Sequence, residues 1–209
     1  VQTCALPIFP FQDSETAKNL LRAFAGESQA RNRYDFAANL CQKQELQAMA
    51  FIFQATAMQE QAHAKVFWDH LQALNGQNLP IYGAYPIEGT NRILELLRAA
   101  QHNEHEEHGS VYPSFAAIAT QEGFPEAAAS FRQIAAIEQL HGERFGLLAD
   151  QLESGALFVS QIETGWMCLN CGHTQNSLEA PKQCPVCNHG QGWFIRLELA
   201  PWSPVVKQT

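Results

Sequence analysis

The sequence predicts a mainly α fold in which a four-helix bundle is followed by a small metal-binding β domain. Residues 14–154 carry long stretches with apolar side chains at every third or fourth position, the period of an amphipathic helix. From Gly155 onward the pattern changes to short β-like runs around cysteines. Those cysteines form two C-x2-C pairs with twelve residues between them, which suits one metal ion better than disulfides.

Start and stop signals predict the helices one by one. They are expected over residues 14–44, 46–75, 90–122 and 125–154. Ser14 is a good N-cap for the first helix, and Gly76 ends the second. Pro113 is expected to kink the third helix, and Gly123 ends it. Pro125 fits the first turn of the fourth. Two short connections and one long crossover are typical of a ferritin-like four-helix bundle.

Length and composition set broad limits on function. The chain has 209 residues, 46% of them hydrophobic and 16% charged, which is the composition of a globular protein of one or two domains. A formal charge of −8 without a Lys/Arg cluster argues against nucleic acid as a partner. No apolar run is long enough to span a membrane, and no secretory signal is visible. Paired metal-binding thiols indicate a reducing compartment, so we expect a cytoplasmic protein.

The N-terminal octet VQTCALPI looks unrelated to the rest of the chain, and we expect it to be artefactual. The predicted organisation is therefore an artefactual or disordered N-terminus over residues 1–13, the bundle over 14–154, and the metal-binding domain with a C-terminal tail over 155–209.

Each predicted helix has a carboxylate in its apolar stripe near mid-length. In the segment IAAIEQLHGERF, Glu138 and His141 occupy the two stripe positions between Ile134 and Phe145. The other helices place these residues in their stripes: Glu27; Glu60 with His63; and Glu104 with Glu107. The motif Glu-x-x-His occurs twice, as EQAH and EQLH.

A single glutamate or histidine of this kind is more often a paired boundary residue or a hydrogen-bonded core residue than a ligand. Five carboxylates and two imidazoles together would be prohibitive in a core without counter-charge. Two divalent cations supply that charge, and Glu-x-x-His puts both ligands on one helix face. The sequence therefore predicts a dinuclear site of iron or manganese, which zinc can enter by mass action.

The cysteine pairs supply a second set of ligands: Cys168, Cys171, Cys184 and Cys187. Four thiolates are the ligand set of a mononuclear tetrahedral site, and their spacing leaves iron and zinc equally open. Iron can carry single electrons and zinc cannot. Because a one-electron carrier joined to a redox-capable dinuclear site makes functional sense, we favour iron.

Taken together, these motifs resemble the rubrerythrin family. The resemblance covers about residues 14–199 and is carried by FAGESQARNRY, EQAHAKVF, YPSFAAIATQEGF, IEQLHGERF and the cysteine module. It implies a ferritin-like di-iron bundle with a rubredoxin-like domain. Glu60 and Glu138 would bridge the irons, and Glu104 and His141 would bind one of them. Glu27 would bind the other iron, whose last position would alternate between Glu107 and His63.

The resemblance also assigns tyrosines and a reaction. Tyr34 and Tyr112 match tyrosines that hydrogen-bond the site carboxylates, although both also fit as plain aromatic core residues. The implied activity is reduction of hydrogen peroxide to water in oxidative-stress defence. Electrons would pass through the Cys4 iron from a rubredoxin or an NAD(P)H-linked reductase, within a head-to-tail homodimer. The alternatives are a ferroxidase or iron-handling protein of the same fold, and a zinc-ribbon interaction module on a structural bundle.

One stretch departs from the family pattern. The segment HGSVYP stands where the family usually has YTEMYP, so Gly109 and Ser110 lie just beside the predicted ligands. A glycine inside a helix costs about 1 kcal/mol relative to alanine, which leaves the local geometry open. His102, His105 and His108 are additional imidazoles in this stretch, and we expect them to lie on a solvated face.

Overall fold

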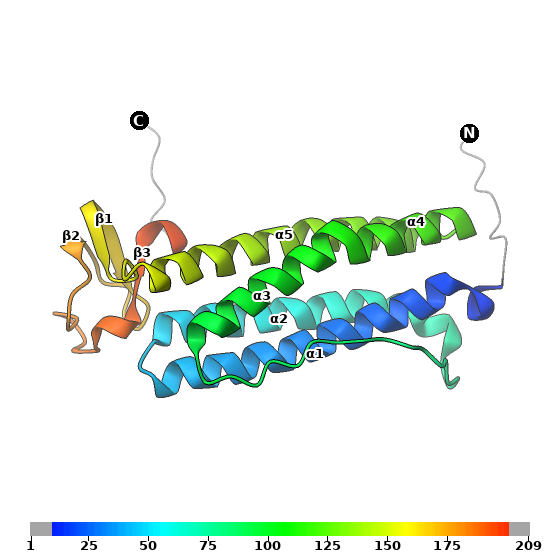
Figure 1. The fold of residues 1–209 in the computed structure, drawn as a ribbon, viewed down its shortest axis with the longest axis horizontal. Coiled ribbons are helices and arrows are strands. Elements are labelled where there is room, and N and C mark those ends of the chain that lie inside the picture. Colours follow the sequence, from blue (N-terminus) through cyan, green and yellow to red (C-terminus); the bar gives the residue numbers. More distant parts are fainter. Residues whose placement is uncertain (1–9, 201–209) are drawn as a thin grey trace.

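The computed structural model describes residues 10–200, which form a long helical bundle with a small β domain at one end (Figure 1). The bundle helices are α1 (Glu15–Lys43), α2 (Gln47–His70), α3 (Ile93–Glu106), α4 (Tyr112–Glu122) and α5 (Pro125–Glu153). The predicted fold class is confirmed. The expected second helix is α-helical only to His70 and continues as a 3-10 turn over Leu71–Leu74. No helix in the described part of the chain has the length and apolar character needed to cross a membrane.

The last residues of the expected N-terminal segment have a defined conformation in the structure. Residues 1–9, including the octet, are outside the described residues, but Phe11–Asp13 form a 3-10 turn. The ring of Phe11 packs edge-on against Phe124, with 5.3 Å between the ring centroids. Ser14 is the N-cap of α1, as predicted, because its hydroxyl accepts a hydrogen bond from the Ala17 backbone N–H at 3.0 Å.

The third helix of the bundle is interrupted before Pro113 rather than at it. A π-helical turn, Glu107–Val111, separates α3 from α4, and Pro113 lies in the first turn of α4. A proline lacks the backbone N–H and its ring collides with the carbonyl of the preceding turn, so the chain widens there instead of continuing as an α-helix.

The π-helical turn changes which residues face the core. Continued at steps of three and four residues, the apolar stripe that contains Glu104 predicts Val111, Phe115 and Ile118 on the core face. The buried residues of α4 are instead Tyr112, Ala116 and Ala119. The stripe is therefore correct up to Glu104 and wrong by one position afterwards, because a π-helical turn takes up one extra residue.

The core of the bundle consists of two apolar clusters with the polar stripe residues between them. One cluster includes Tyr34, Phe53 and Phe145, and the other includes Phe67 and Phe131. In each long helix the predicted carboxylate falls between the residues of the two clusters. The aromatic packing on both sides therefore fixes the four helices around one polar layer.

The small domain is a three-stranded antiparallel sheet with the strand order β2-β1-β3. Its strands are β1 (Val159–Cys168), β2 (Thr174–Glu179) and β3 (Phe194–Arg196). Met167 and Ile195 belong to the same apolar cluster as Met49 and Leu148 of the bundle. A Cβ at Gly192 would overlap the backbone carbonyl of Glu45, so this glycine permits the close approach of the domain to the α1–α2 turn.

Candidate metal centres

The four long helices bring their polar stripe residues together at mid-bundle. Glu27, Glu60, Glu104 and Glu138 are at most 1% exposed, and both histidines are buried. The side chains form two groups, within each of which the ligand atoms lie within 4.8 Å of one another: Glu27, Glu60, His63 and Glu138; and Glu60, Glu104, Glu138 and His141. Glu60 and Glu138 belong to both groups, which is the arrangement expected of two cations with two shared carboxylates.

The shared carboxylates lie between the two imidazoles. His63 Nδ1 is 2.8 Å from one Glu138 oxygen and 3.1 Å from one Glu60 oxygen. His141 Nδ1 is 2.8 Å and 3.0 Å from the other oxygens of the same two residues. The imidazole rings are stacked, with centroids 5.7 Å apart. Each Nδ1 therefore faces one oxygen of both shared carboxylates.

Several of these fully buried atoms make no hydrogen bond of good geometry among the described residues, although some lie within ion-pair distance of an imidazole or carboxylate. They are Glu27 Oε2, Glu60 Oε1, Glu104 Oε2, both oxygens of Glu138, and His141 Nδ1. Burying so many acceptors that lack well-formed hydrogen bonds is costly, whereas carboxylate oxygens and neutral imidazole nitrogens are good ligands for divalent metals. The donor set therefore fits a dinuclear metal centre.

The electrostatics of the cluster point in the same direction. Burial raises the pKa of Glu27 well above its usual range, and the carboxylates of Glu138 and Glu60 raise it further. Burial likewise raises the pKa of Glu104 to about 8. Burial opposes a charged His141, but the carboxylates of Glu104, Glu138 and Glu60 prevail and raise its pKa to about 11. Without metal the cluster keeps protons as its positive charge, and metal binding must release them.

Both predicted tyrosines contact the cluster. The Tyr34 hydroxyl donates a hydrogen bond to Glu104, and the Tyr112 hydroxyl donates one to Glu27. Both rings are buried in the apolar clusters on the two sides of the polar layer. Each tyrosine therefore orients one terminal carboxylate while its ring packs in the core.

A further contact was missed by the sequence analysis. His141 Nε2 lies 2.9 Å from the side-chain oxygen of Gln59, which is an exposed residue of α2. If Nε2–H donates to Gln59, the lone pair of Nδ1 is available to a metal. Gln59 directly precedes the predicted ligand Glu60, but nothing else in the sequence distinguishes it from other exposed helical glutamines as a partner of His141.

Glu107 is the one predicted bundle ligand that lies outside both groups. It begins the π-helical turn, is partly exposed, and lines a cavity of about 310 Å³ with Arg33, Tyr85 and Asn103. Burial raises its pKa well above the usual range, as does the Glu104 carboxylate, whereas the Arg33 guanidinium opposes the shift. Its role as an alternating ligand remains a prediction.

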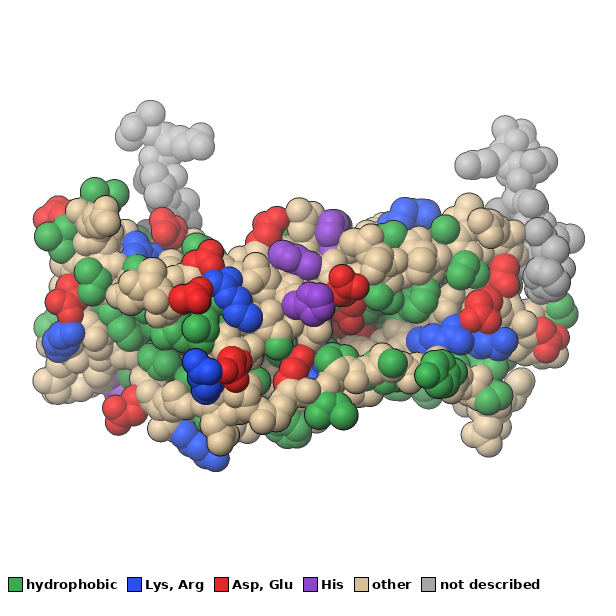
Figure 2. All heavy atoms as spheres, in the orientation of Figure 1, with side chains coloured by type: hydrophobic (Ala, Val, Ile, Leu, Met, Phe, Trp, Pro, Cys, Tyr) green, Lys and Arg blue, Asp and Glu red, His purple; other side chains and the backbone are tan. Residues whose placement is uncertain are grey.

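The additional histidines do not form a further metal group in the described part of the chain. His102 and His105 are exposed, in agreement with a solvated face, and histidine side chains gather on the surface near the middle of the molecule in Figure 2. His108 Nδ1 instead lies 2.8 Å from the Ala135 carbonyl of α5.

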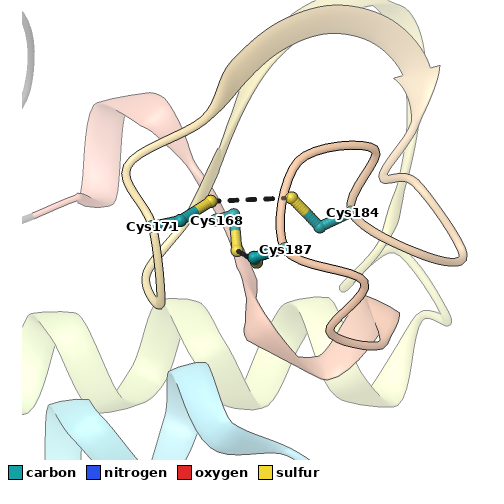
Figure 3. A group of neighbouring side chains, drawn as sticks. All are labelled: Cys168, Cys171, Cys184 and Cys187. Carbon is teal, nitrogen blue, oxygen red and sulfur yellow. Dashed lines mark hydrogen bonds between the residues drawn. The ribbon is translucent and has the colours of Figure 1, made fainter.

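The cysteines of the small domain converge on one point (Figure 3). The Sγ atoms of Cys168 and Cys187 are 3.7 Å apart, and those of Cys171 and Cys184 are 3.6 Å apart. Four thiolates at about 2.3 Å from a tetrahedral ion would be separated by about 3.8 Å, so the spacing fits such an ion.

Two similar turns hold the cysteines. The backbone N–H of Gly172 donates to the Cys168 carbonyl at 2.8 Å, and that of Asn188 donates to the Cys184 carbonyl at 2.9 Å. Gly172 and Asn188 both adopt a left-handed backbone, with φ of 76° and 60°. The backbone N–H of His189 lowers the pKa of Cys187 to about 5, which favours the thiolate.

Fold and site together define a class of protein: a helical bundle with a dinuclear carboxylate centre, joined to a four-thiolate metal domain. The family model described as Rubrerythrin matches residues 18–149, and the model of the rubrerythrin rubredoxin-like domain matches residues 166–195. The chain belongs to the rubrerythrin family, and the resemblance inferred from its motifs is confirmed.

Similar proteins of known name agree with this assignment. The chain is 45% identical over 181 residues to a rubrerythrin of Porphyromonas gingivalis, covering 87% of this chain and 89% of that protein. It is 40% identical to a rubrerythrin of Nitratidesulfovibrio vulgaris, covering 89% and 96%. A solved structure of partially reduced nigerythrin has a TM-score of 0.60 at 22% identity, with 94% of this chain and 98% of that chain covered. The bundle alone resembles Mycobacterium tuberculosis bacterioferritin BfrA, with a TM-score of 0.59 at 18% identity and 68% and 88% covered.

Proposed function

We propose that this chain is a peroxidase that reduces hydrogen peroxide, with two protons and two electrons, to two molecules of water. The observation that carries the proposal is the pair of overlapping ligand groups that share Glu60 and Glu138. A shared pair of carboxylates holds two metal ions side by side, so one substrate molecule can receive two electrons from the same centre. Iron is the metal we propose for both the bundle and the cysteine site.

The bundle residues would hold the metal ions as the two groups indicate. When bound there, two ferrous ions supply the electrons for cleavage of the O–O bond and act as Lewis acids toward the oxygens. Tyr34 and Tyr112 keep Glu104 and Glu27 oriented through their hydroxyl groups. Glu107 borders the same cavity as Tyr112, whose hydroxyl donates to Glu27 of the cluster, and this place suits Glu107 to hold or transfer a proton beside the substrate. We further propose that Glu107 and His63 replace each other as ligands with oxidation state.

The position of the small domain supports transfer of electrons between two chains. Met49, in contact with this domain, precedes Glu60 by eleven residues of α2, which is about 17 Å along the helix. A head-to-tail homodimer would give the Cys4 iron of one chain a shorter path to the cluster of the other. The surface of α1 and α2 has a groove of about 740 Å³, lined in part by Met58, Trp68 and the two sequence neighbours of His63, Ala62 and Ala64. We propose this groove as the surface that receives the partner's small domain.

The physiological setting follows from the same proposal. The electrons would come from a rubredoxin or an NAD(P)H-linked reductase, and the protein would act in the cytoplasm in defence against peroxide. A reducing compartment keeps the four cysteines from forming disulfides before they bind a metal, which is the physical reason for this location.

The test is a visible spectrum and metal analysis of the full chain, followed by rapid mixing of the reduced protein with peroxide or with oxygen. We expect ferric-thiolate absorption, about three irons per chain, and reoxidation that is much faster with peroxide. The Glu138→Ala variant is the matched control, because it should lose the bundle irons and keep the Cys4 iron. Faster reaction with oxygen and accumulation of ferric mineral would instead establish a ferroxidase. A colourless protein with one zinc would refute both.

A further inference from the structure

The crossover between α2 and α3 covers the cavity that borders Glu107. Figure 1 shows this segment running along α1. Arg22 Nε of α1 donates to the Tyr82 carbonyl at 2.8 Å, and the Tyr85 hydroxyl donates back to the Arg22 carbonyl at 3.0 Å. At the other end, Asn103 of α3 donates to the Glu88 carboxylate at 2.5 Å. The cavity is therefore a fixed feature of the bundle, with one wall made by the crossover.

Arg33 of α1 lines this cavity with unused hydrogen-bond donors. Its side chain is only 16% exposed, and its nearest carboxylate oxygen, on Glu88, is 3.7 Å from Nη1. Nε and Nη1 are both buried, and neither has a hydrogen-bond partner among the described residues. A guanidinium has five N–H donors, and leaving charged donors unpaired in a buried site is costly. The unpaired donors of Arg33 are therefore suited to bind a carboxylate that moves into the cavity in only some states of the protein.

Two carboxylates of α3 and the π-helical turn line this cavity, and Glu107 is the more buried of them, because Glu106 is exposed and accepts from Ser110. The Glu107 side chain stands outside both ligand groups. Helical side chains lean toward the N-terminus of their helix, which for Glu107 is the direction of Asn103, one turn earlier. Asn103 donates to the Glu88 carboxylate that lies beside Arg33, so Glu107, Asn103 and Arg33 border the same side of one cavity.

We propose that Arg33 is a positioning residue for Glu107: it receives the Glu107 carboxylate whenever that carboxylate is not a metal ligand. The inference rests on the proposed exchange between Glu107 and His63. Its physical content is that a carboxylate leaving a cation needs another positive partner, and a bidentate guanidinium supplies one with matching geometry. Arg33 thereby stabilises the arrangement in which His63 faces the metal.

A crystal structure of the full chain loaded with zinc tests the proposal without redox chemistry, because zinc is divalent like ferrous iron and keeps its charge. We expect Glu107 off the metal, within hydrogen-bond distance of Arg33, and His63 on the metal. If Glu107 leaves the metal but binds a group other than Arg33, the exchange of Glu107 with His63 is supported and the proposed role of Arg33 is refuted. If Glu107 stays on the metal, the exchange itself is refuted, and the role of Arg33 with it.

A redox measurement tests the same idea in the iron protein. In Arg33→Gln, the ratio of ferrous to ferric bundle iron at a fixed potential should fall about tenfold, the equivalent of one charge-assisted hydrogen bond. Arg33→Lys keeps the charge and should restore part of the ratio. Arg92→Gln is the control, because Arg92 is 73% exposed and pairs with Glu95 at the surface. An Arg33→Gln ratio equal to that of the unaltered chain would overturn the proposal.

Discussion

At the scale of single residues, three of the predicted ligands have one polar atom hydrogen-bonded to a neighbouring side chain, which leaves the other polar atom for the metal. Glu104 and Glu27 are each fixed by a tyrosine hydroxyl, and His141 is fixed by Gln59. Such contacts decide which ligand atom faces the metal before the metal arrives. They also raise the affinity, because less side-chain freedom is lost on binding.

Replacing Gln59 by leucine should weaken metal binding without removing a ligand. The His141 ring loses the acceptor for Nε2–H, so its orientation and tautomer are no longer fixed. We expect the affinity of the metal-free bundle for ferrous iron to fall about 10- to 100-fold, measured by competition with a chelator. Gln54→Leu, at another exposed position of α2, is the control. Equal affinities in the two variants would show that the Gln59 contact has no such role.

The buried cluster should make the metal-free protein less stable as the pH rises. The raised pKa values of Glu104, about 8, and His141, about 11, mean that the folded chain keeps protons that the unfolded chain has lost. Folding stability therefore decreases with pH above the unfolded pKa of each group. Between pH 6.5 and 8 we expect a loss of at least about 2 kcal/mol, measured by urea unfolding of chelator-treated protein at 222 nm.

The metal-loaded protein is the internal control for this pH effect. Because metal binding releases those protons, its stability should hold or rise over the same interval. A metal-free protein that becomes more stable from pH 6.5 to 8 would contradict the protonated cluster.

At the scale of elements, the π-helical turn Glu107–Val111 is the feature that completes the site. It takes up one residue, so that Tyr112 rather than Val111 enters the core and reaches Glu27. It also places Glu107 at the cavity instead of in the ligand groups. The interruption therefore separates a fixed ligand, Glu104, from one that is free to move.

Gly109→Ala tests whether this turn needs a glycine. A Cβ at Gly109 would meet no atom within 4 Å, and its φ does not lie in the left-handed region. Alanine should therefore raise the free energy of unfolding by about 0.5–1 kcal/mol through its helix propensity, with the metal content unchanged. Loss of stability or of the bundle metals would show that the turn depends on glycine flexibility.

At the scale of the whole molecule, two metal-binding domains share an apolar core. Met167 and Ile195 of the small domain pack with Met49 of the bundle, and Gly192 lies against the carbonyl of Glu45. This contact holds the Cys4 site at one end of its own bundle. The proposed route between two chains follows from it, since a freely tethered domain could reach its own cluster.

Gly192→Ala should release the small domain from the bundle. The new Cβ would overlap the Glu45 carbonyl, so the contact must open, at a cost of about 1–3 kcal/mol. We expect faster proteolysis between α5 and β1, with the dinuclear site intact. Gly190→Ala is the matched control, because a Cβ there meets nothing within 4 Å. Identical cleavage rates in the two variants would show that this contact does not hold the domain.

By itself, the sequence determined the fold class, the helix stripes before the π-helical turn, the clustered carboxylates and imidazoles, and the cysteine site. These features depend on local periodicity and on residue chemistry, so they can be predicted from the order of residues along the chain. Only the tertiary structure decided the one-residue shift at Tyr112, the contact of Gln59 with His141, the place of Glu107 beside Arg33, and the docking at Gly192. Each of these depends on how segments distant in the chain pack against one another, and no local pattern records that.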